Sequence, residues 1–228
     1  MIFNEHQALN GKHALLSPSS SSFLNYTDDG MLDNLERRHY ATRIGTALHE
    51  YAEKHIEYEI KMSTNKALKP EFLLYLLGRG IPENVIDVDY LFYNLAAYIN
   101  DAIKFGMSPE VKLAIPDDIS GNPYGDPPAF GTADAISFDN NLLRIHDLKT
   151  GTTPAHFDQL MCYASLFCLE YGRPLGFRPG DISVELRIYQ ANDVQILNPT
   201  VQDLTSCIDR IVYCSRYMVD HFKTPQVE

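Results

Sequence analysis

The fold of this chain is decided by residues 130–150, FGTADAISFDNNLLRIHDLKT. Phe130 to Phe138 is predicted to form one short strand, and Leu142 to Leu148 a second. Between them, Asn140 and Asn141 fit the two central positions of a tight turn, because asparagine tolerates positive φ. The stretch therefore predicts a β-hairpin.

This turn determines which side chains of the two strands lie opposite each other. Asp139 pairs with Leu142, and counting outward sets Asp134 directly across from Asp147. Strand side chains alternate between the two faces of a sheet. One face is therefore expected to carry an apolar stripe with charged residues at its open end: Ile136, Phe138, Leu143, Ile145, then Asp134, Asp147 and Lys149.

Two carboxylates at the end of an apolar stripe destabilise a sheet, because like charges placed opposite each other repel. Burying a carboxylate costs more still, unless it is paired or binds a cation. Asp134 and Asp147 therefore indicate a metal site. The alternative is a solvated polar face, the commoner meaning of an Asp-X-Lys triplet on a strand. A helical run with Gln159 and Tyr163 follows the hairpin and favours the metal site.

Composition limits the functions available to the chain. It has 228 residues, 45% of them apolar, which is typical of one large globular domain. No membrane span and no signal peptide are expected, since long apolar runs and a charged-then-apolar leader are missing from the sequence. The net charge is −11, from 19 basic and 30 acidic residues. Any DNA function must therefore depend on a local basic patch, a bound metal or a partner.

The four cysteines fall in expected helices, and none forms a C-x-x-C pair: Cys162, Cys168, Cys207 and Cys214. Buried free thiols in a reducing cytoplasm are expected.

Leu16 to Tyr26, LSPSSSSFLNY, allows two interpretations. It can be a flexible linker or the start of a helix capped by serine. The helix start is favoured, because aromatic and aliphatic residues follow at once. A long helix is then predicted from Asp33 to about Met62, since apolar residues recur at spacings of three and four: Ile44, Ala47, Leu48, Tyr51, Ala52 and His55.

His49 lies within this long helix, with Glu50 beside it and Glu53 one turn further on. Considered alone, it is a helix-surface or core-edge histidine. Considered with the hairpin, it becomes a candidate metal-tuning residue. Three arginines toward the start of the helix are usually a solvated face, but here they become candidate phosphate contacts: Arg37, Arg38 and Arg43.

The rest of the chain is expected to form, in order, helices at 68–77 and 85–105, a strand at 111–115 with Glu110 at its start, a mobile surface loop at 116–128, a helix at 155–170, a connector at 172–180, strands at 182–190 and 194–197, and a closing helix at 201–222.

Five short motifs occur in a defined order along these elements: Gly45-x-x-x-His49, Glu110, Gly131-x-x-Asp134, Asp147-x-Lys149-Thr150-Gly151 and Gln159-x-x-x-Tyr163. The series resembles the PD-(D/E)XK nuclease superfamily, specifically its RecB-type exonuclease branch, which includes phage-borne relatives. The resemblance covers roughly residues 16–190, and the Leu16-Ser-Pro-Ser start is similar to the N-terminal segment of that branch. The metal acid of the branch, sometimes Glu, is Asp147 here.

The resemblance implies an α/β fold with a restriction-endonuclease-like core, a central mixed β-sheet flanked by helices. It implies a single nuclease domain over residues 1–228, with a mostly helical part at about 16–106 and the sheet-containing core at about 107–222. Some relatives carry four cysteines for an iron–sulfur cluster, one before the core and three after it. Cys162 and Cys168 do not follow that pattern, so no iron–sulfur cluster is expected.

The resemblance also implies a metal site. Asp134, Asp147 and the backbone carbonyl of Leu148 would hold Mg²⁺ or Mn²⁺, both of which favour oxygen ligands. His49 would add a nitrogen ligand or orient a bound water. Glu110 would serve as a more distant acid or as a ligand of a second metal.

Three further residues would take part in catalysis. Lys149 would lie beside the attacking water, lowering its pKa and neutralising the charge that develops on phosphorus. Gln159 and Tyr163, four apart on one helix face, would position DNA or the metal-site side chains. The expected DNA contacts are Arg37, Arg38, Arg43 and Thr150.

The implied function is that of a metal-dependent deoxyribonuclease, an exonuclease of recombination or repair in the cytoplasm of a bacterium or phage-infected host cell. DNA is the expected partner, together with a single-strand annealing or recombination protein or further copies of the chain, and no membrane. Two alternatives remain open: a catalytically silent DNA-binding or scaffold module, and a metal-dependent phosphodiesterase that acts on RNA or a small nucleotide.

Overall fold

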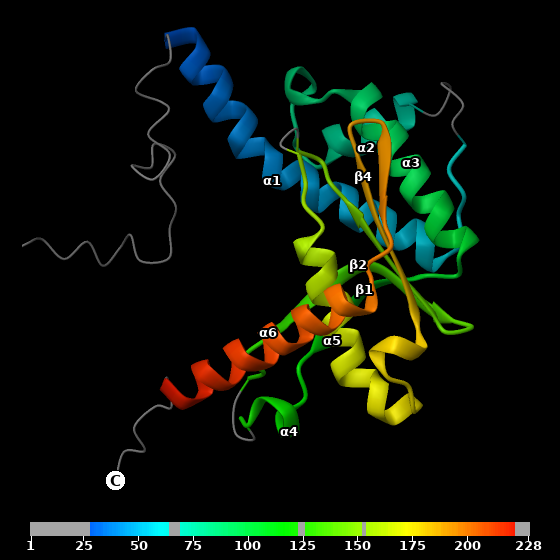
Figure 1. Cartoon of the computed structure of the whole chain (residues 1–228). Helices are drawn as coiled ribbons and strands as arrows, with labels where there is room; N and C mark the ends of the chain where they lie inside the picture. Colours follow the sequence, from blue (N-terminus) through cyan, green and yellow to red (C-terminus); the bar gives the residue numbers. More distant parts are fainter. Residues whose placement is uncertain (1–27, 64–68, 123–125, 152–153, 222–228) are drawn as a thin grey trace, which may run out of the picture.

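The chain forms a five-stranded mixed β-sheet flanked by helices, as seen in a computed structural model (Figure 1). The structure describes residues 28–63, 69–122, 126–151 and 154–221, and in the first helix it describes the side chains from Tyr40 onward. The elements are α1 (Asp28–Glu57), α2 (Lys69–Gly78), a 3-10 turn (Glu83–Val85), α3 (Val88–Lys104), β1 (Ser108–Ala114), α4 (Asp117–Ser120), β2 (Phe130–Asp139), β3 (Leu142–Leu148), α5 (Asp158–Leu175), a second 3-10 turn (Pro179–Asp181), β4 (Ser183–Gln190), β5 (Asp193–Leu197) and α6 (Val201–His221). The predicted fold class is confirmed, while the predicted helix start at Leu16 to Tyr26 lies outside the described residues.

The strands lie side by side in chain order, from β1 to β5. Neighbouring strands are antiparallel except β3 and β4, which run parallel. A parallel pair requires a long crossover connection, and α5 supplies it. This crossover brings the start of α5 back to the end of β3, where the side chain of Lys149 meets that of Gln159.

The hairpin between β2 and β3 has the predicted register. Asp139 pairs with Leu142, and the ladder continues inward to Ala135 opposite His146. Asn140 and Asn141 have φ angles of 49° and 58°, the left-handed values that a tight two-residue turn requires. The local sequence was therefore sufficient to place this turn.

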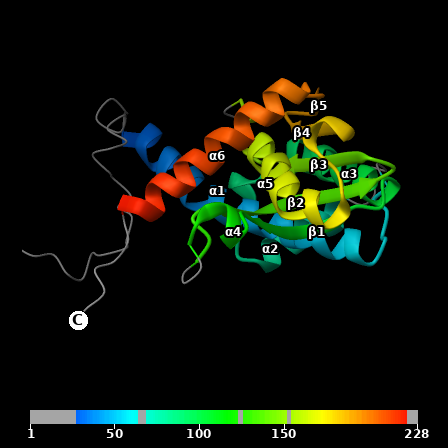
Figure 2. The same cartoon turned by 60° about the horizontal axis from the view of Figure 1, so that its bottom comes forward.

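Two hydrophobic clusters cover the sheet. One joins the helical first part of the chain, α1 to α3, to the sheet through Ala135, Leu148 and Tyr189. The other lies between the sheet and the helices α5 and α6, and it contains the predicted apolar stripe: Ile136, Phe138, Leu143 and Ile145. Figure 2 shows α5 and α6 packed side by side. No helix within the described ranges is long and apolar enough to cross a membrane.

The alternation of faces along the first two strands is broken at one level of the sheet. On β2, Ala133 and Ile136 both belong to the cluster under α5, although they are three residues apart, and Ala135 belongs to the cluster under α1. At the same level of β1, Glu110 has a positive φ of 49°. The expectation that Asp134 shares a face with Ile136 assumed unbroken alternation, and the alternation is broken between these two residues.

Several predicted boundaries were wrong. Helix α1 spans Asp28–Glu57 instead of Asp33 to Met62, and the expected loop at 116–128 contains the short helix α4. Helix α5 continues to Leu175, past the connector expected from Gly172. Gly172 does not end the helix; it lies where an added Cβ would be 3.1 Å from the backbone oxygen of Phe177. The helix ends instead at Gly176, with φ 75°.

The turn makes a testable prediction about Asn141. Valine should destabilise the protein by about 1–2 kcal/mol, because a β-branched residue resists the left-handed conformation. Glycine should be neutral or stabilising, because it adopts that conformation freely. Urea unfolding of the two variants and the wild type measures the difference. Equal stability of Asn141→Val and Asn141→Gly would contradict the turn.

Candidate functional site

The site lies where β2 and β3 separate, beside α1. The β2–β3 ladder ends at the pair Ala135 and His146, one residue before Asp134 and Asp147 would face each other. Beyond this point the backbone N–H of Leu148 donates to Oδ2 of Asp134 at 3.0 Å. A carboxylate has therefore replaced a strand-to-strand backbone contact, and this holds the charge of Asp134 beside β3.

Three side chains from three elements converge on the α1 side of this point. Nδ1 of His49, on α1, lies 3.7 Å from a carboxylate oxygen of Glu110 on β1 and 3.6 Å from one of Asp134 on β2. One ligand atom from each of the three lies within 4.8 Å of the others. Among the described residues this is the group of His, Cys, Asp and Glu side chains close enough to share a metal ion. Glu110, expected to be more distant, belongs to this group.

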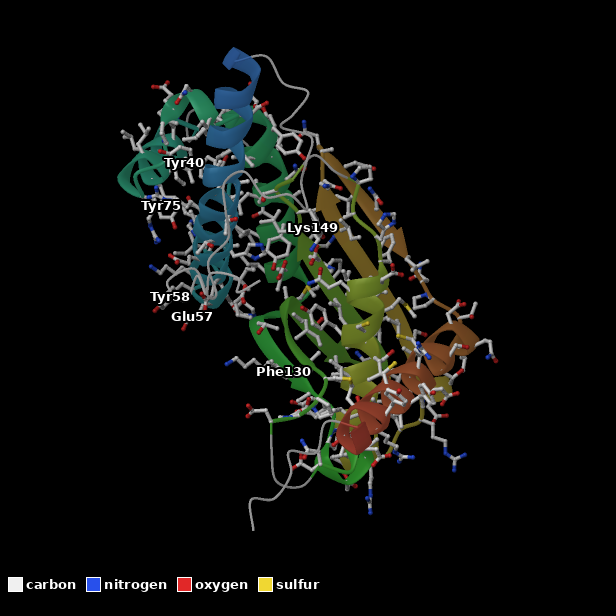
Figure 3. The ribbon with its side chains drawn as sticks, turned by 90° about the vertical axis from the view of Figure 1, so that its left-hand side faces the viewer. Tyr40, Glu57, Tyr58, Tyr75, Phe130 and Lys149 are labelled. Carbon is white, nitrogen blue, oxygen red and sulfur yellow. The ribbon has the colours of Figure 1, made fainter. Side chains whose placement is uncertain are left out.

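The three residues line a cleft of about 420 Å³, whose wall is mostly acidic: Thr46, His49, Glu50, Glu53, Glu110 and Asp134. Sequence reasoning assigned no role to Thr46 or Glu53. They are three residues before and four after His49, a spacing that places them on the same helix face and could have identified them. Figure 3 views the molecule with its side chains drawn and labels Lys149 and Phe130.

Burial and crowding in this cleft disfavour the ionised form of its acids. Burial, followed by the nearby charge of Asp147, raises the pKa of Asp134 to about 6. Burial is also the largest influence on His49 and lowers its pKa, but the attraction of Glu110 and Asp134 outweighs it, and the pKa of His49 ends above its ordinary value. These are the shifts expected where acids are crowded without enough positive charge.

Asp147 is 2% exposed, and its two carboxylate oxygens have different surroundings. Oδ1 accepts a hydrogen bond from Nζ of Lys149 at 2.9 Å. Oδ2 is buried and has no hydrogen-bond partner among the residues that the structure describes. Burial is the main cause that raises the pKa of Asp147, although Lys149 opposes it. A buried, unpartnered carboxylate oxygen is costly, and a cation would satisfy it.

Lys149 connects Asp147 to the crossover helix. Its Nζ also donates to Oε1 of Gln159 at 2.8 Å, and the amide of Gln159 donates to the hydroxyl of Tyr163 at 3.1 Å. The Tyr163 ring in turn lies against β2, where an added Cβ on Gly131 would be 2.8 Å from its Cε1. Gly131 thus leaves room for Tyr163, and the predicted catalytic residues Asp147, Lys149, Gln159 and Tyr163 are joined in one chain of contacts.

The loop after β3 is fixed by residues that sequence reasoning did not assign. The backbone carbonyl of Gly151 accepts from the hydroxyl of Tyr90 at 3.0 Å and from the side-chain amide of Gln190 at 2.6 Å. Thr150 lies next to α1, with Oγ1 only 3.6 Å from where a Cβ on Gly45 would be. Tyr90 and Gln190 come from distant parts of the chain, and no local signal could have linked them to this loop.

The predicted DNA-contacting arginines are only partly placed. Arg43 donates from Nη2 to the backbone carbonyl of Arg79 at 2.8 Å, and its guanidinium lies over the Tyr40 ring at 5.5 Å. Arg43 therefore already holds the turn after α2, and contact with a phosphate would use its remaining N–H groups. The side chains of Arg37 and Arg38 lie outside the described part of α1.

These residues fit a hard divalent cation. The cleft offers carboxylate oxygens from Asp134 and Glu110, one imidazole nitrogen from His49, and close by the unpartnered oxygen of Asp147. Oxygen ligands with a single imidazole suit Mg²⁺ or Mn²⁺. The carbonyl of Leu148, whose N–H is held by Asp134, stays a prediction as a ligand.

A family model described as "Protein of unknown function (DUF2800)" matches residues 13–206. The match covers most of the chain, including every residue of the site from His49 to Tyr163, so the chain belongs to this family. No curated protein and no solved structure matches it.

The raised pKa of Asp134 predicts a pH-dependent loss of stability. In the unfolded chain an aspartate ionises near its ordinary pKa of about 4, whereas folded Asp134 keeps its proton to about 6. The folded state binds more protons in this window, so the metal-free protein should lose stability as pH rises from about 4 to about 6. Asp134→Asn should flatten this part of the profile, measured by urea unfolding at each pH. The pKa of His49 is raised above its ordinary value of about 6.5, so the effect of His49 on stability falls at higher pH than this range. An unchanged profile would contradict burial of the Asp134 charge.

Divalent metal should raise the melting temperature of the wild type. At a concentration a hundredfold above Kd, binding adds about 2.7 kcal/mol, or about 5–10 °C for a protein of this size. Thermal melts with Mn²⁺ should show this shift, and Asp134→Asn should lose it. Glu53→Gln, on the wall of the same cleft but outside the group around His49, should retain it. Equal shifts in the wild type and Asp134→Asn would remove Asp134 from the metal site.

Proposed function

We propose that this member of the DUF2800 family is a metal-dependent deoxyribonuclease that hydrolyses phosphodiester bonds and is related to the RecB-type exonucleases of the PD-(D/E)XK superfamily. One observation carries the proposal. The buried carboxylate of Asp147 has one oxygen bonded to Lys149 and the other without a partner, next to the group formed by His49, Glu110 and Asp134. A lysine and a cation-seeking acid on one strand end match what the Asp-X-Lys motif of that superfamily requires.

In this proposal the two acids have different tasks. Asp134 and Asp147 hold the cation, and His49 supplies a nitrogen ligand or orients a bound water. The bound metal would supply Lewis-acid polarisation of a phosphate oxygen and a lowered pKa for a bound water. The contact between Leu148 N–H and Asp134 fixes one acid in place before the cation arrives. Such preorganisation lowers the reorganisation that the reaction requires.

Lys149 is held in a defined position for work on the reacting phosphate. A lysine ammonium has three donors, and Asp147 and Gln159 accept from two of them, at 2.9 and 2.8 Å. The third is left to donate to the attacking water or to a phosphate oxygen as negative charge develops there. Asp147 thus orients the ammonium group of Lys149 and also offsets part of its positive charge.

Gln159 and Tyr163 position Lys149 and the substrate backbone. The hydrogen bond between them is 3.1 Å long, and their spacing of four residues puts both on one face of α5. Contact of the Tyr163 ring with Gly131 fixes that face against β2. A phosphate bound beside Lys149 would therefore meet polar groups of α5 already in position.

The acidic surface shapes how DNA would bind. A net charge of −11 and a cleft lined by glutamates repel a polyanion. The bound cation and Lys149 then provide the local attraction. We propose that sustained action on DNA also requires further copies of the chain or a partner such as a single-strand annealing or recombination protein, which would hold the strand.

The proposal is tested with end-labelled linear DNA, closed circular DNA, single-stranded DNA and RNA, each incubated with Mg²⁺, Mn²⁺ or EDTA. Cleavage of linear DNA with metal, and none with EDTA, is expected. Preference for RNA would favour the alternative phosphodiesterase. Metal-dependent stabilisation without cleavage of any nucleic acid would favour a silent binding module.

Lys149→Ala separates catalysis from metal binding. It should lower the cleavage rate by about 10²–10³-fold, because it removes a preorganised charge from the reacting phosphate, while the thermal shift with Mn²⁺ persists. Lys112→Ala is the matched control, since Lys112 is an exposed lysine on β1. Cleavage by Lys149→Ala at the rate of the wild type would refute the nuclease assignment.

A further inference from the structure

The four cysteines of the chain are free thiols on α5 and α6. Cys168 is buried, as expected, whereas Cys162 is exposed and Cys207 and Cys214 are half-buried, which corrects the expectation of buried thiols. A different group of reactive side chains lies beside the cleft, where two arginines meet between α1 and the turn after α2.

These two arginines, Arg43 on α1 and Arg79 just after α2, are brought together by the fold. Nη2 of Arg43 donates to the backbone carbonyl of Arg79 at 2.8 Å. Gly80 has a positive φ of 69° and leaves room for this contact, because an added Cβ would be 3.1 Å from the same Nη2. The hydroxyl of Tyr75, on α2, donates to the backbone carbonyl of Ala47 on α1 at 3.0 Å. The two helices are therefore tied to each other next to the arginine pair.

Each guanidinium group of the pair lies over a tyrosine ring. Cζ of Arg43 is 5.5 Å from the centre of the Tyr40 ring, and Cζ of Arg79 is 5.1 Å from that of the Tyr75 ring; Figure 3 labels both tyrosines. An aromatic ring under the face of a guanidinium holds the side chain but leaves the N–H groups at its edge able to donate. Both arginines are exposed, so an anion can reach these donors.

A single carboxylate offsets the charge of the two arginines. Nη1 of Arg79 forms an ion pair with Oε2 of Glu50, and within the described ranges no other acid lies at ion-pair distance from either guanidinium. Glu50 also lines the cleft and follows His49 directly in the sequence. The pair therefore keeps an excess of positive charge at the rim of an acidic cleft, in a chain whose net charge is −11.

We propose that Arg43 and Arg79 form a binding site for a phosphate group of the substrate, and that Glu50 is its internal counterion, which the phosphate displaces from Arg79. A guanidinium has five N–H donors in a planar fork that matches the oxygens of a phosphate group. One donor of Arg43 is used by the carbonyl of Arg79, and the others remain for an anion. That the phosphate belongs to a nucleic acid rests on the proposed function, whereas the presence of a phosphate site does not.

The distance from the metal residues decides which phosphate the pair would hold. Arg43 lies six residues before His49, which is about 9 Å along α1 at 1.5 Å per residue. One phosphate group is too small to contact both places, so the pair would bind a neighbour of the phosphate at the cation. The substrate class that fits is therefore a strand with more than one phosphate, and a small nucleotide with a single phosphate does not use the whole site.

The phosphate site is tested by NMR titration of the isotope-labelled full chain with thymidine 3′,5′-bisphosphate, in EDTA so that the cleft holds no cation. The side-chain Nε–H signals of Arg43 and Arg79 should shift, and thymidine, which has no phosphate, should leave them in place. Arg79→Ala should raise Kd at least about fivefold, since hydrogen bonds between charged groups are the strong ones. Arg79→Lys, which keeps the charge but not the planar fork, should lie between the two.

Arg173→Ala is the matched control for this titration. It also removes an exposed arginine that pairs with one acid, Asp118, but on the far end of α5, and it should leave Kd unchanged. Equal Kd in the wild type, Arg79→Ala and Arg173→Ala would overturn the proposal. So would a titration that shifts neither arginine signal.

The role of Glu50 predicts a change in the opposite direction. Glu50→Gln should lower Kd for the bisphosphate several-fold, because the phosphate no longer competes with a carboxylate for Arg79. Glu53→Gln removes the same charge from the same wall of the cleft, but Glu53 does not pair with Arg79. It should lower Kd less, through the weaker attraction between separated charges. Equal effects of the two variants would overturn the counterion role of Glu50.

The contribution to the substrate is measured by cleavage of a short single-stranded oligonucleotide with Mn²⁺. Arg79→Ala should raise KM several-fold with little change in kcat, because the pair binds a phosphate that does not react. An unchanged KM would overturn the placement of the substrate on this pair. If the chain cleaves no nucleic acid, the proposed function fails while the bisphosphate titration still decides the phosphate site.

Discussion

The structure depends on keeping two carboxylates, Asp134 and Asp147, close together where water is scarce. Their positions follow from the hairpin register, yet the strands stop pairing one residue before the two would meet. This separation reduces the repulsion between the like charges on the two neighbouring strands. It leaves both carboxylates at the end of the β2–β3 ladder as candidate ligands for a cation.

The surrounding elements offset this concentration of charge in different ways. The N–H of Leu148 leaves the sheet ladder and donates to Asp134, Lys149 pairs with Asp147, and His49 approaches from α1. None of these satisfies the second oxygen of Asp147. The described side chains thus compensate the charge of the two acids only in part, a pattern that functional sites show more often than the rest of a fold.

Sequence reasoning was accurate where the decisive interactions are local. The Asn140-Asn141 turn and the register of the hairpin follow from residues near one another in the chain, whereas the fold class was implied by the order of motifs from Gly45 to Tyr163. The approach of His49 to Asp134 required packing of α1 against the sheet, which local patterns do not specify. It was indicated only when His49 was considered together with the hairpin and with the order of motifs. The left-handed Glu110 and the hydrogen bonds that hold the loop after β3 had no local signal at all, because they depend on contacts between distant segments.

The charge distribution also implies an order of binding under the proposed function. The cleft gathers Glu53, Glu110 and Asp134, and the nearby cation Lys149 is already engaged by Asp147. A polyanion would therefore meet net repulsion until a divalent cation occupies the cleft. Since coupling between two ligands is reciprocal, DNA that binds only the metal-loaded form must in turn tighten metal binding. The acidity of the chain would then restrict DNA binding to the place where the cation lies, so that binding and catalysis share one requirement.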